Sequence, residues 1–273
     1  MRITFFEWDG TSPTQHLAAA LGSDEVQVWT ARMPKDDTAS AKLAAVISPD
    51  ERERAERFLV SEPRREFIFA RAALRHLLGA CLQIAPASLV FGQQSQGKPF
   101  LLQPNAGHDV AFNLSHSGGM LAIALGRGRE IGVDIEFIHG LADFRELAPH
   151  FFSPRELAEL HALPKTQQRA AFFNGWTRKE AWLKATGEGL TDSLPRIQVT
   201  LTPGMKPDLL GVPGSCEAAR WWSMAEIPLP PDFAGAVVFS GSKINKSRSG
   251  EPYLLLGQRY FSHERAEGGE SLP

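Results

Sequence analysis

The sequence predicts an α+β fold built from two similar halves, and three observations lead to this prediction. Strand-like segments and long helical segments occur in both parts of the chain. A weak internal repeat recurs at an offset of 105 residues, where Ser48-Pro49-x-Glu51 returns as Ser153-Pro154-x-Glu156. The 273 residues, of which 43% are hydrophobic, are enough to bury the core of one large domain or of two small ones.

The first half is expected to contain two helices and at least three strands. Ser48 is a typical N-cap, followed by Pro49 at the first helical position and acids in the first turn. A longer helix is expected from about Arg64 to Leu82. Strands are expected at 26–31, 89–92 and 110–114, and the segment 93–109, rich in Gln, Gly and Pro, is expected to be a loop.

The second half is expected to open with a β-hairpin. Residues 120–125 are apolar, 126–130 read as a turn, and 131–138 resume with alternation. Ser153 caps a short helix, as Ser48 does, and a longer helix is expected over 166–185. Later strands are expected at 197–201, 218–224 and 234–240. The polar segment 242–273 is expected to be a poorly ordered tail, although 253–256 could dock locally.

Two acids lie on one face of the second strand of the predicted hairpin. Val133, Ile135 and Phe137 alternate with Asp134 and Glu136, so both carboxylates point to the opposite face. Their Cα atoms should lie ~6.8 Å apart, and their repulsion is costly unless a cation or solvent relieves it. Mg²⁺ suits such a pair, because it takes one or two carboxylates and fills its other positions with water and phosphate oxygens. The simpler alternative is a solvated polar face on an antiparallel strand.

A second acid–base pattern lies on the helix expected over 166–185. Glu180 and Lys184 are four residues apart and therefore share one helix face. A carboxylate and an ammonium side by side can bind a metal ion and a phosphate oxygen together. The alternative is an ordinary surface pair worth a few tenths of a kcal/mol. Four nearby aromatic residues are expected to belong to the core: Phe172, Phe173, Trp176 and Trp182.

Four motifs, in this order along the chain, resemble those of the 4′-phosphopantetheinyl transferases of the surfactin (Sfp-like) type. They are Gly97-Lys98-Pro99, Asn113-Leu-Ser115-His116-Ser117, Gly132-Val-Asp134-Ile-Glu136 and Trp176-Thr-Arg-Lys-Glu180-Ala-Trp-Leu-Lys184. The resemblance extends from about Ser48 to the strand expected at 234–240. It implies two similar α/β halves in a pseudo-twofold arrangement, with the active site between them. The halves would be 1–119, with the coenzyme A contacts, and 120–241, with the metal site and catalytic residues.

The resemblance also implies the activity and the catalytic groups. The family transfers 4′-phosphopantetheine from coenzyme A to a serine of an apo acyl or peptidyl carrier protein, releases adenosine 3′,5′-bisphosphate and depends on Mg²⁺. It implies that Asp134, Glu136 and Glu180 bind the metal ion. Glu180 would also be the general base, directly or through a water molecule, and Lys184 would stabilise or protonate the leaving phosphate.

The coenzyme A contacts follow from the same resemblance. The residues at matching positions are Arg54, Lys98, Pro99, Asn113, Ser115, His116 and Lys184, with Arg65 and Arg71 as weaker candidates. Each has a simpler alternative. A lone histidine is often structural, a loop lysine is usually exposed, and the arginines among the acids of 50–75 could belong to a solvated, salt-bridged helix pair.

Two other functions remain open from the residues alone. A metal-dependent phosphodiesterase or pyrophosphatase could use the same carboxylates with water in place of serine. The sequence offers no second carboxylate or histidine cluster of the two-metal type. A carrier-binding module without catalysis is the other alternative, against which stand the intact acids and Lys184.

Composition restricts the partners and the compartment. The formal net charge is −2, so no overall basic field would attract nucleic acid. The two cysteines, Cys81 and Cys216, are far apart and form no CxxC motif, which fits a reducing cytosol. No apolar run reaches the ~18 residues of a membrane span, and Glu7 and Asp9 interrupt the apolar start. We therefore expect a cytoplasmic protein, and the resemblance implies a monomer with pseudo-dimeric halves.

Overall fold

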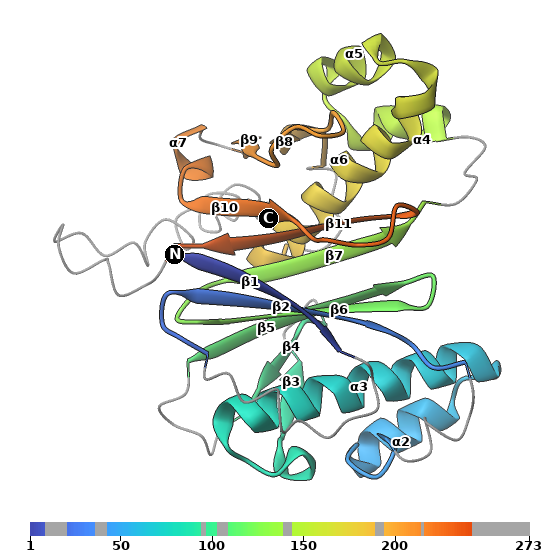
Figure 1. Cartoon of the computed structure of the whole chain (residues 1–273), viewed down its shortest axis with the longest axis vertical. Coiled ribbons are helices and arrows are strands. Elements are labelled where there is room, and N and C mark those ends of the chain that lie inside the picture. Colours follow the sequence, from blue (N-terminus) through green and yellow to red (C-terminus); the bar gives the residue numbers. More distant parts are fainter. Residues whose placement is uncertain are drawn as a thin grey trace, which may run out of the picture.

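The structure is a computed structural model in which two sheets lie face to face between two layers of helices (Figure 1). It describes residues 1–8, 21–35, 43–93, 97–102, 109–138, 144–188, 194–213 and 216–241. The tail predicted at 242–273, with its possible docking segment 253–256, lies outside the described residues.

The first layer pair is a four-stranded sheet covered by a long helix. The sheet has the order β1-β2-β6-β5, in which β1 runs parallel to β2 and the other pairs are antiparallel. These strands are β1 (Arg2–Trp8), β2 (Glu25–Arg32), β5 (Val110–Ser117) and β6 (Met120–Arg127). Below them lie α2 (Pro49–Glu56), α3 (Ser61–Leu82), the 3₁₀ turn η1 (Pro86–Ser88) and the small sheet of β3 (Phe91–Gln93) and β4 (Pro99–Leu101). Trp29, Phe69 and Leu125 are among the buried residues that join this sheet to α3.

The second layer pair repeats this plan with a three-stranded sheet. Its order is β10-β11-β7, and both pairs are antiparallel. The strands are β7 (Ile131–Phe137), β10 (Trp222–Glu226) and β11 (Phe233–Ser240). The other elements are α4 (Phe144–Phe151), α5 (Pro154–Ala162), α6 (Lys165–Thr186), η2 (Leu194–Arg196), β8 (Gln198–Val199), β9 (Leu209–Gly211) and α7 (Cys216–Ala219). The long helix α6 crosses the outer face of the sheet (Figure 1).

A shared apolar core joins the two sheets. Val28 and Ala122 of the first sheet are fully buried against Val133, Ile135 and Val237 of the second. Strand β6 is buried along nearly its whole length, because one face meets α3 and the other meets the second sheet. This double burial explains why its sequence is a continuous apolar run rather than an alternating one.

The internal repeat is visible as two matching helix pairs. The carboxylate of Glu51 accepts the backbone N–H of Ser48 at 2.9 Å, and Glu156 accepts that of Ser153 at 2.8 Å. Each capped short helix precedes a helix of 22 residues, α3 in one half and α6 in the other. The predicted N-caps and long helices are therefore confirmed, and so is the prediction of an α+β fold.

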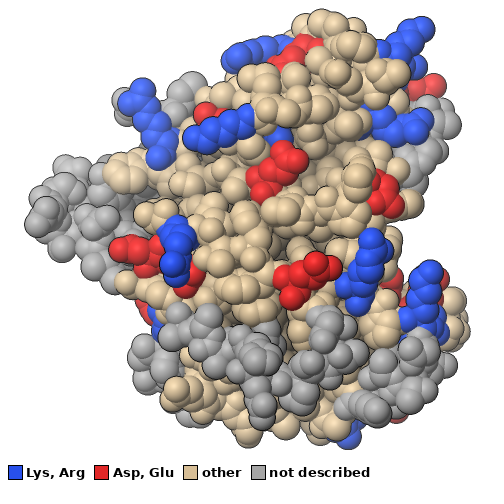
Figure 2. Space-filling model, viewed as in Figure 1, with Lys and Arg blue, Asp and Glu red and all other residues tan. Residues whose placement is uncertain are grey.

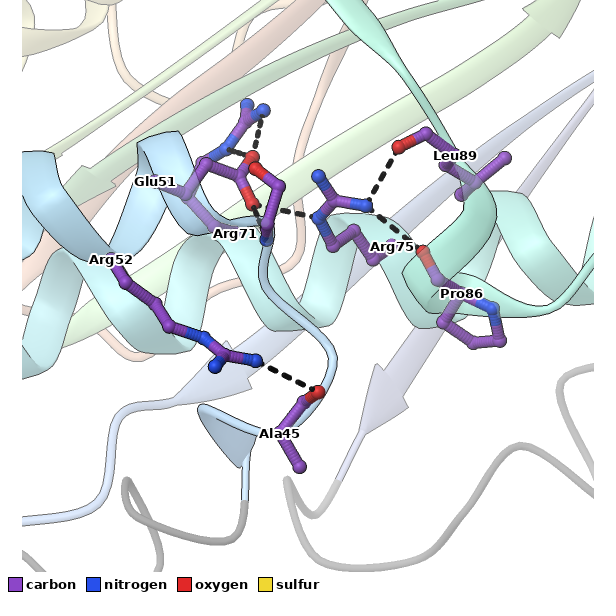
Figure 3. A network of polar contacts seen from close by, with 8 residues as sticks. Ala45, Glu51, Arg52, Arg71, Arg75, Pro86 and Leu89 are labelled. Carbon is purple, nitrogen blue, oxygen red and sulfur yellow. Dashed lines mark hydrogen bonds and ion pairs between the residues drawn. The ribbon is translucent and has the colours of Figure 1, made fainter.

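Each capping glutamate also pairs with basic side chains from the long helix of its own half. In the first half Glu51 binds Arg71 and Arg75, and Arg75 donates further to the carbonyls of Pro86 at 3.0 Å and Leu89 at 2.8 Å (Figure 3). In the second half Glu156 accepts from Lys179 Nζ at 2.7 Å. The caps therefore also fix each short helix to its long neighbour.

Three expectations about local structure are wrong. Residues 120–138 form no hairpin, because β6 and β7 belong to different sheets and the turn between them carries the chain from one layer to the next. The loop expected over 93–109 contains β4, where Phe100 and Leu101 pair with β3. The strand expected at 218–224 begins as the helix α7, and β10 starts only at Trp222.

The expected boundary between the halves, at 119–120, falls between two strands of the first sheet. The first sheet includes β6, so it extends past residue 119 to Arg127. The division at 119–120 stays a prediction.

The surface carries charges of both signs. On the face shown in Figure 2, lysines and arginines are interspersed with aspartates and glutamates among uncharged residues. Among the helices that the structure describes, none has the length and apolarity needed to cross a membrane.

Candidate active site

The candidate site forms where β5 of the first sheet meets β7 of the second. Small polar side chains of β5 bridge the two strands. Asn113 Oδ1 accepts the backbone N–H of Val133 at 2.8 Å, and Ser115 Oγ donates to Asp134 Oδ1 at 2.9 Å. Further along, Ser117 Oγ donates to Glu136 Oε2 at 2.8 Å. The two predicted acids of β7 are thus held in place from the other half of the molecule.

Asp134 is the most buried acid of the site, with 3% of its surface exposed. Its Oδ1 atom accepts from Ser115 and, at 2.7 Å, from Lys184 Nζ. Its Oδ2 atom is buried without a hydrogen-bond partner. Burial raises the pKa of Asp134 to about 6, although the ammonium of Lys184 opposes this rise.

Helix α6 places Glu180 and Lys184 over the same acid, as their spacing predicts. Lys184 Nζ also donates to Ser115 Oγ at 3.0 Å, and its side chain is 31% exposed. Glu180 Oε1 is buried and, like Asp134 Oδ2, has no hydrogen-bond partner. Burial, reinforced by the negative charges of Asp134 and Glu136, raises the pKa of Glu180 to about 7.

The donor chemistry of these residues suits a hard cation. Within the described residues, no three side chains of His, Cys, Asp or Glu are gathered closely enough to hold a metal ion as they stand. Nevertheless, Asp134 and Glu180 each have a buried oxygen without a partner. The negative charge of Glu136 contributes to the raised pKa of Asp134, and those of Asp134 and Glu136 contribute to the raised pKa of Glu180. A divalent cation would relieve both costs, and carboxylate oxygens are ligands that Mg²⁺ accepts.

The predicted coenzyme residues differ in how open they are. His116 is 43% exposed and lies beside the start of α3, its Nδ1 atom 3.7 Å from Glu66 Oε2. Arg54 is exposed on α2 and stacks on Phe67, 5.3 Å from the ring centroid. Asn113 and Ser115 are 6% and 7% exposed. His116 and Arg54 are therefore accessible to a ligand, whereas Asn113 and Ser115 already hold residues of β7.

The remaining candidates are engaged within the protein. Arg71 pairs with Glu51 and lies 4.6 Å from the ring centroid of Phe91 (Figure 3). Lys98 Nζ donates to backbone carbonyls, and burial lowers its pKa to about 8. Pro99 opens β4 and pairs with Gln93. Arg65 is half-buried on α3.

Sequence reasoning missed two residues that shape the site. Ser117, the last residue of the motif at 113–117, binds Glu136. Strand alternation could have predicted this role, because it places Ser117 on the same strand face as Asn113 and Ser115. Glu66 reaches His116 from α3, and no sequence signal points to this long-range contact. Of the four aromatic residues expected in the core, Phe172, Phe173 and Trp182 are buried, whereas Trp176 is half-buried and packs edge-on against Phe151.

A separate depression of about 400 Å³ lies beyond the end of β7. Arg145, Lys165 and Arg169 line it together with Phe144. None of the predicted site residues lines it, so it is distinct from the candidate site.

Carboxylates and an ammonium thus meet at the junction of two α/β halves, and groups of both kinds are used by enzymes that handle phosphate. Two family models match the chain: "4′-phosphopantetheinyl transferase superfamily" over residues 130–238 and "4′-phosphopantetheinyl transferase, N-terminal" over residues 29–126. The chain belongs to the 4′-phosphopantetheinyl transferase family, and its enzyme class is 4′-phosphopantetheinyl transferase.

Curated relatives agree with this assignment. The 4′-phosphopantetheinyl transferase HetI of Nostoc sp. (strain PCC 7120) is 38% identical over 219 residues, which cover 80% of this chain and 89% of the relative. The 4′-phosphopantetheinyl transferase Sfp of Bacillus subtilis (strain 168) is 30% identical over 62% of this chain and 72% of its own length. The 4′-phosphopantetheinyl transferase AcpT of Salmonella typhimurium is 44% identical over 41% of this chain and 56% of its own length.

Proposed function

We propose that this enzyme transfers 4′-phosphopantetheine from coenzyme A to a serine of an apo acyl or peptidyl carrier protein, in a Mg²⁺-dependent reaction. Adenosine 3′,5′-bisphosphate is the second product. The observation that carries the proposal is the convergence of Asp134, Glu180 and Lys184, with one unpartnered buried oxygen on each acid. Family membership supplies the substrate class.

Asp134, Glu136 and Glu180 are the residues that would hold Mg²⁺. When bound, the ion supplies positive charge that neutralises the diphosphate of the coenzyme. The half-buried ammonium of Lys184 is compatible with this role, because a phosphate oxygen can take the place of Asp134 as its partner.

The reaction needs a base for the serine hydroxyl and a positive charge for the leaving phosphate. Glu180 takes the serine proton, and in the protein without a bound ion burial raises its pKa to about 7, which favours proton uptake near neutral pH. The serine oxygen then forms a bond to the phosphorus that carries pantetheine, while the bond from that phosphorus to the bridging oxygen breaks. Lys184, one turn along the helix, stabilises the negative charge that develops on the departing phosphate.

Two accessible side chains of the first half are the proposed coenzyme contacts. His116 and Arg54 are open to solvent near α2 and α3, where phosphate groups of coenzyme A could reach them. Ser115 is buried between Asp134 and Lys184, so its role is to orient both groups.

Mass spectrometry of the carrier tests the proposal directly. Purified enzyme is mixed with coenzyme A, Mg²⁺ and an apo carrier domain, and the carrier is weighed intact. We expect a mass gain equal to one phosphopantetheine, which is lost with EDTA and in Asp134→Ala and Glu180→Ala variants that remain folded. Release of phosphopantetheine without a change in carrier mass would instead indicate hydrolysis and contradict the proposal.

Kinetics separate the role of Lys184 from simple ligand binding. Lys184→Met should lower kcat by about 10²–10³-fold, as loss of one group that stabilises transition-state charge commonly does. The KM for coenzyme A should change much less, because the charge that Lys184 matches develops during the reaction. A raised KM with normal kcat would contradict the assigned role.

A further inference from the structure

The motif lysine at position 98 is directed into the protein rather than toward a ligand. Its Nζ atom lies 3.1 Å from the carbonyl oxygen of Ile131, 2.5 Å from that of Lys184 and 3.2 Å from that of Ala185. Lysine has three N–H donors, and here each has a carbonyl partner. No donor is left for a phosphate oxygen unless one of these bonds is broken.

Two of the three carbonyls belong to the last turn of α6. Carbonyls in the last turn of a helix lack partners within the helix and favour a nearby cation. The C-cap, Gly187, has a φ of 80° and its N–H donates to Leu183 O at 2.8 Å, so it satisfies a third carbonyl of this turn. Lys98 therefore completes the helix cap from a segment 86 residues away.

The third carbonyl, that of Ile131, joins the same ammonium to strand β7. Ile131 is the first residue of β7, and the neighbouring Gly132 lies against the backbone of α6. A Cβ atom built on Gly132 would lie 2.1 Å from Ala181 O and 2.4 Å from Ala185 N. The backbones of strand and helix are thus in direct contact, and Lys98 links them beside this contact.

This junction sets the position of the reacting groups. Asp134 lies two residues beyond Gly132 on β7, and Lys184 lies on the helix turn whose carbonyl Lys98 binds. A shift of this turn along the strand would move Lys184 Nζ away from its 2.7 Å contact with Asp134.

We propose that Lys98 is a positioning residue, which fixes the last turn of α6 against β7 and so holds the Lys184 side chain in the place that transfer requires. This proposal rests on the proposed catalytic role of Lys184. It concerns the side chain of Lys98, and the nucleotide contact that the family resemblance implies for this stretch stays a prediction.

Hydrogen exchange in the enzyme without ligands tests the structural part independently of catalysis. Lys98→Met keeps the aliphatic length but removes all three donors. Peptides that cover the end of α6 and the start of β7 should exchange about tenfold faster or more in this variant. Lys98→Arg should restore much of the protection, and Lys206→Met, at an exposed lysine, should leave it unchanged. Unchanged exchange in a folded Lys98→Met protein would overturn the proposal.

Kinetics test the functional part. Lys98→Met should lower kcat by about 10- to 100-fold, since a misplacement of about 1 Å can cost this much. The KM for coenzyme A should stay within about threefold, and the loss should be the same with dephospho-coenzyme A. The double variant Lys98→Met/Lys184→Met should be no slower than Lys184→Met alone, because both changes remove the same contribution.

Failure of the positioning role and failure of the proposed function would give different results. A raised KM for coenzyme A that disappears with dephospho-coenzyme A would show a contact with the 3′-phosphate and overturn the positioning role. If Lys98→Met unfolds, Lys98→Arg provides the test, and wild-type exchange together with a raised KM in that variant would likewise overturn the role. A wild-type enzyme that transfers nothing would refute the proposed function, while the exchange result would still report on the helix junction.

Discussion

At the scale of single residues, the site is built from charges that the protein alone does not fully satisfy. Asp134 is buried and Glu180 is half-buried, each acid has one buried oxygen without a partner, and both have carboxyl pKa values raised mainly by burial. Such groups cost folding free energy at neutral pH. Acids retained under this cost indicate a ligand that the folded protein is prepared to bind.

The first prediction follows from the raised pKa of Glu180. Because the folded state holds the proton more tightly than the unfolded state, this group stabilises the fold below pH ~4.5 and loses that contribution as pH rises through about 7. In EDTA, wild-type protein should therefore lose about 2 kcal/mol relative to Glu180→Gln between pH 5 and pH 8. Urea unfolding at each pH measures this difference.

Added Mg²⁺ supplies the control for this first prediction. At pH 8 it should raise the free energy of unfolding of wild-type protein, because a ligand that binds only the folded state stabilises it. Glu180→Gln should respond much less. Parallel stability curves for the two proteins, with and without Mg²⁺, would contradict the assignment of Glu180 to the metal site.

The second prediction concerns His116, the most open of the motif residues. His116→Ala should raise the KM for coenzyme A by about tenfold and leave kcat within about threefold, because a residue that binds ground and transition states equally affects binding alone. Steady-state kinetics with coenzyme A and dephospho-coenzyme A measure the effect. Loss of the effect with dephospho-coenzyme A would assign His116 to the 3′-phosphate. A large fall in kcat with unchanged KM would show instead that His116 takes part in the reaction.

Sequence patterns predicted how residues within one strand or helix are placed in the site, but they did not predict the contacts between separate elements. Strand alternation correctly directed Val133 and Ile135 into the core and Asp134 to the other face, and helical spacing brought Glu180 and Lys184 together. The partners of Lys98 and Arg71 could not be predicted in this way. They depend on how separate elements pack, and no periodicity records that packing.

At the scale of elements, each of the repeated capping glutamates bonds groups from more than one element. Glu156 accepts the N–H groups of Ser153 and Val199 and the ammonium of Lys179, which itself is fully buried. The carboxylate therefore links α5, α6 and β8 at one point. Burial lowers the pKa of Lys179 to about 8, and the charge and hydrogen bond of Glu156 oppose this fall.

The third prediction tests this centre. Glu156→Gln should lower the free energy of unfolding by about 3–5 kcal/mol, as removal of one partner of a buried ion pair usually does. The matched control on the same helix is Glu159→Gln. The half-buried carboxylate of Glu159 accepts from Thr202 Oγ1 at 2.7 Å, and this change should cost about 1 kcal/mol or less. Urea denaturation of both variants gives the comparison, and equal losses would contradict the central role of Glu156.

Local sequence signals predicted where the two capped helices begin, but they did not predict how the strands pair. The Ser-Pro starts at 48 and 153 predicted both N-caps, because capping depends on neighbouring residues alone. The apolar segments at 120–125 and 131–138 were correctly predicted as strands but wrongly paired. Strand pairing is a non-local choice, and here the buried run of β6 packs on both faces instead of turning back on β7.

At the scale of the whole molecule, the site belongs to both halves. The first half contributes Ser115, His116 and Ser117, and the second contributes the acids of β7 and the charged face of α6. Side-chain bonds from β5 to β7 join the halves where the two sheets meet. This arrangement supports the expected placement of the site between the halves. The monomeric state and cytoplasmic location stay predictions.

The fourth prediction concerns the segment after the second sheet. The last described backbone bonds are made by Ser240 N to Glu130 O at 3.0 Å and by Gly241 N to Trp221 O at 3.1 Å, and they close β11 onto its neighbours. Every residue proposed for catalysis, metal binding or coenzyme binding precedes this point. A protein that ends at Gly241 should therefore keep its thermal midpoint within about 2 °C and its kcat/KM within about twofold, since such changes lie within the usual range for surface alterations.

The comparison needs both measurements on the same preparations of full-length and shortened protein. Thermal unfolding establishes whether the core stays intact, and intact-mass analysis of the carrier gives the rate of transfer. If the shortened protein remains folded but transfers much more slowly at saturating coenzyme A, residues 242–273 act in the reaction or in holding the carrier. The site would then extend beyond the two sheets and the helices that cover them.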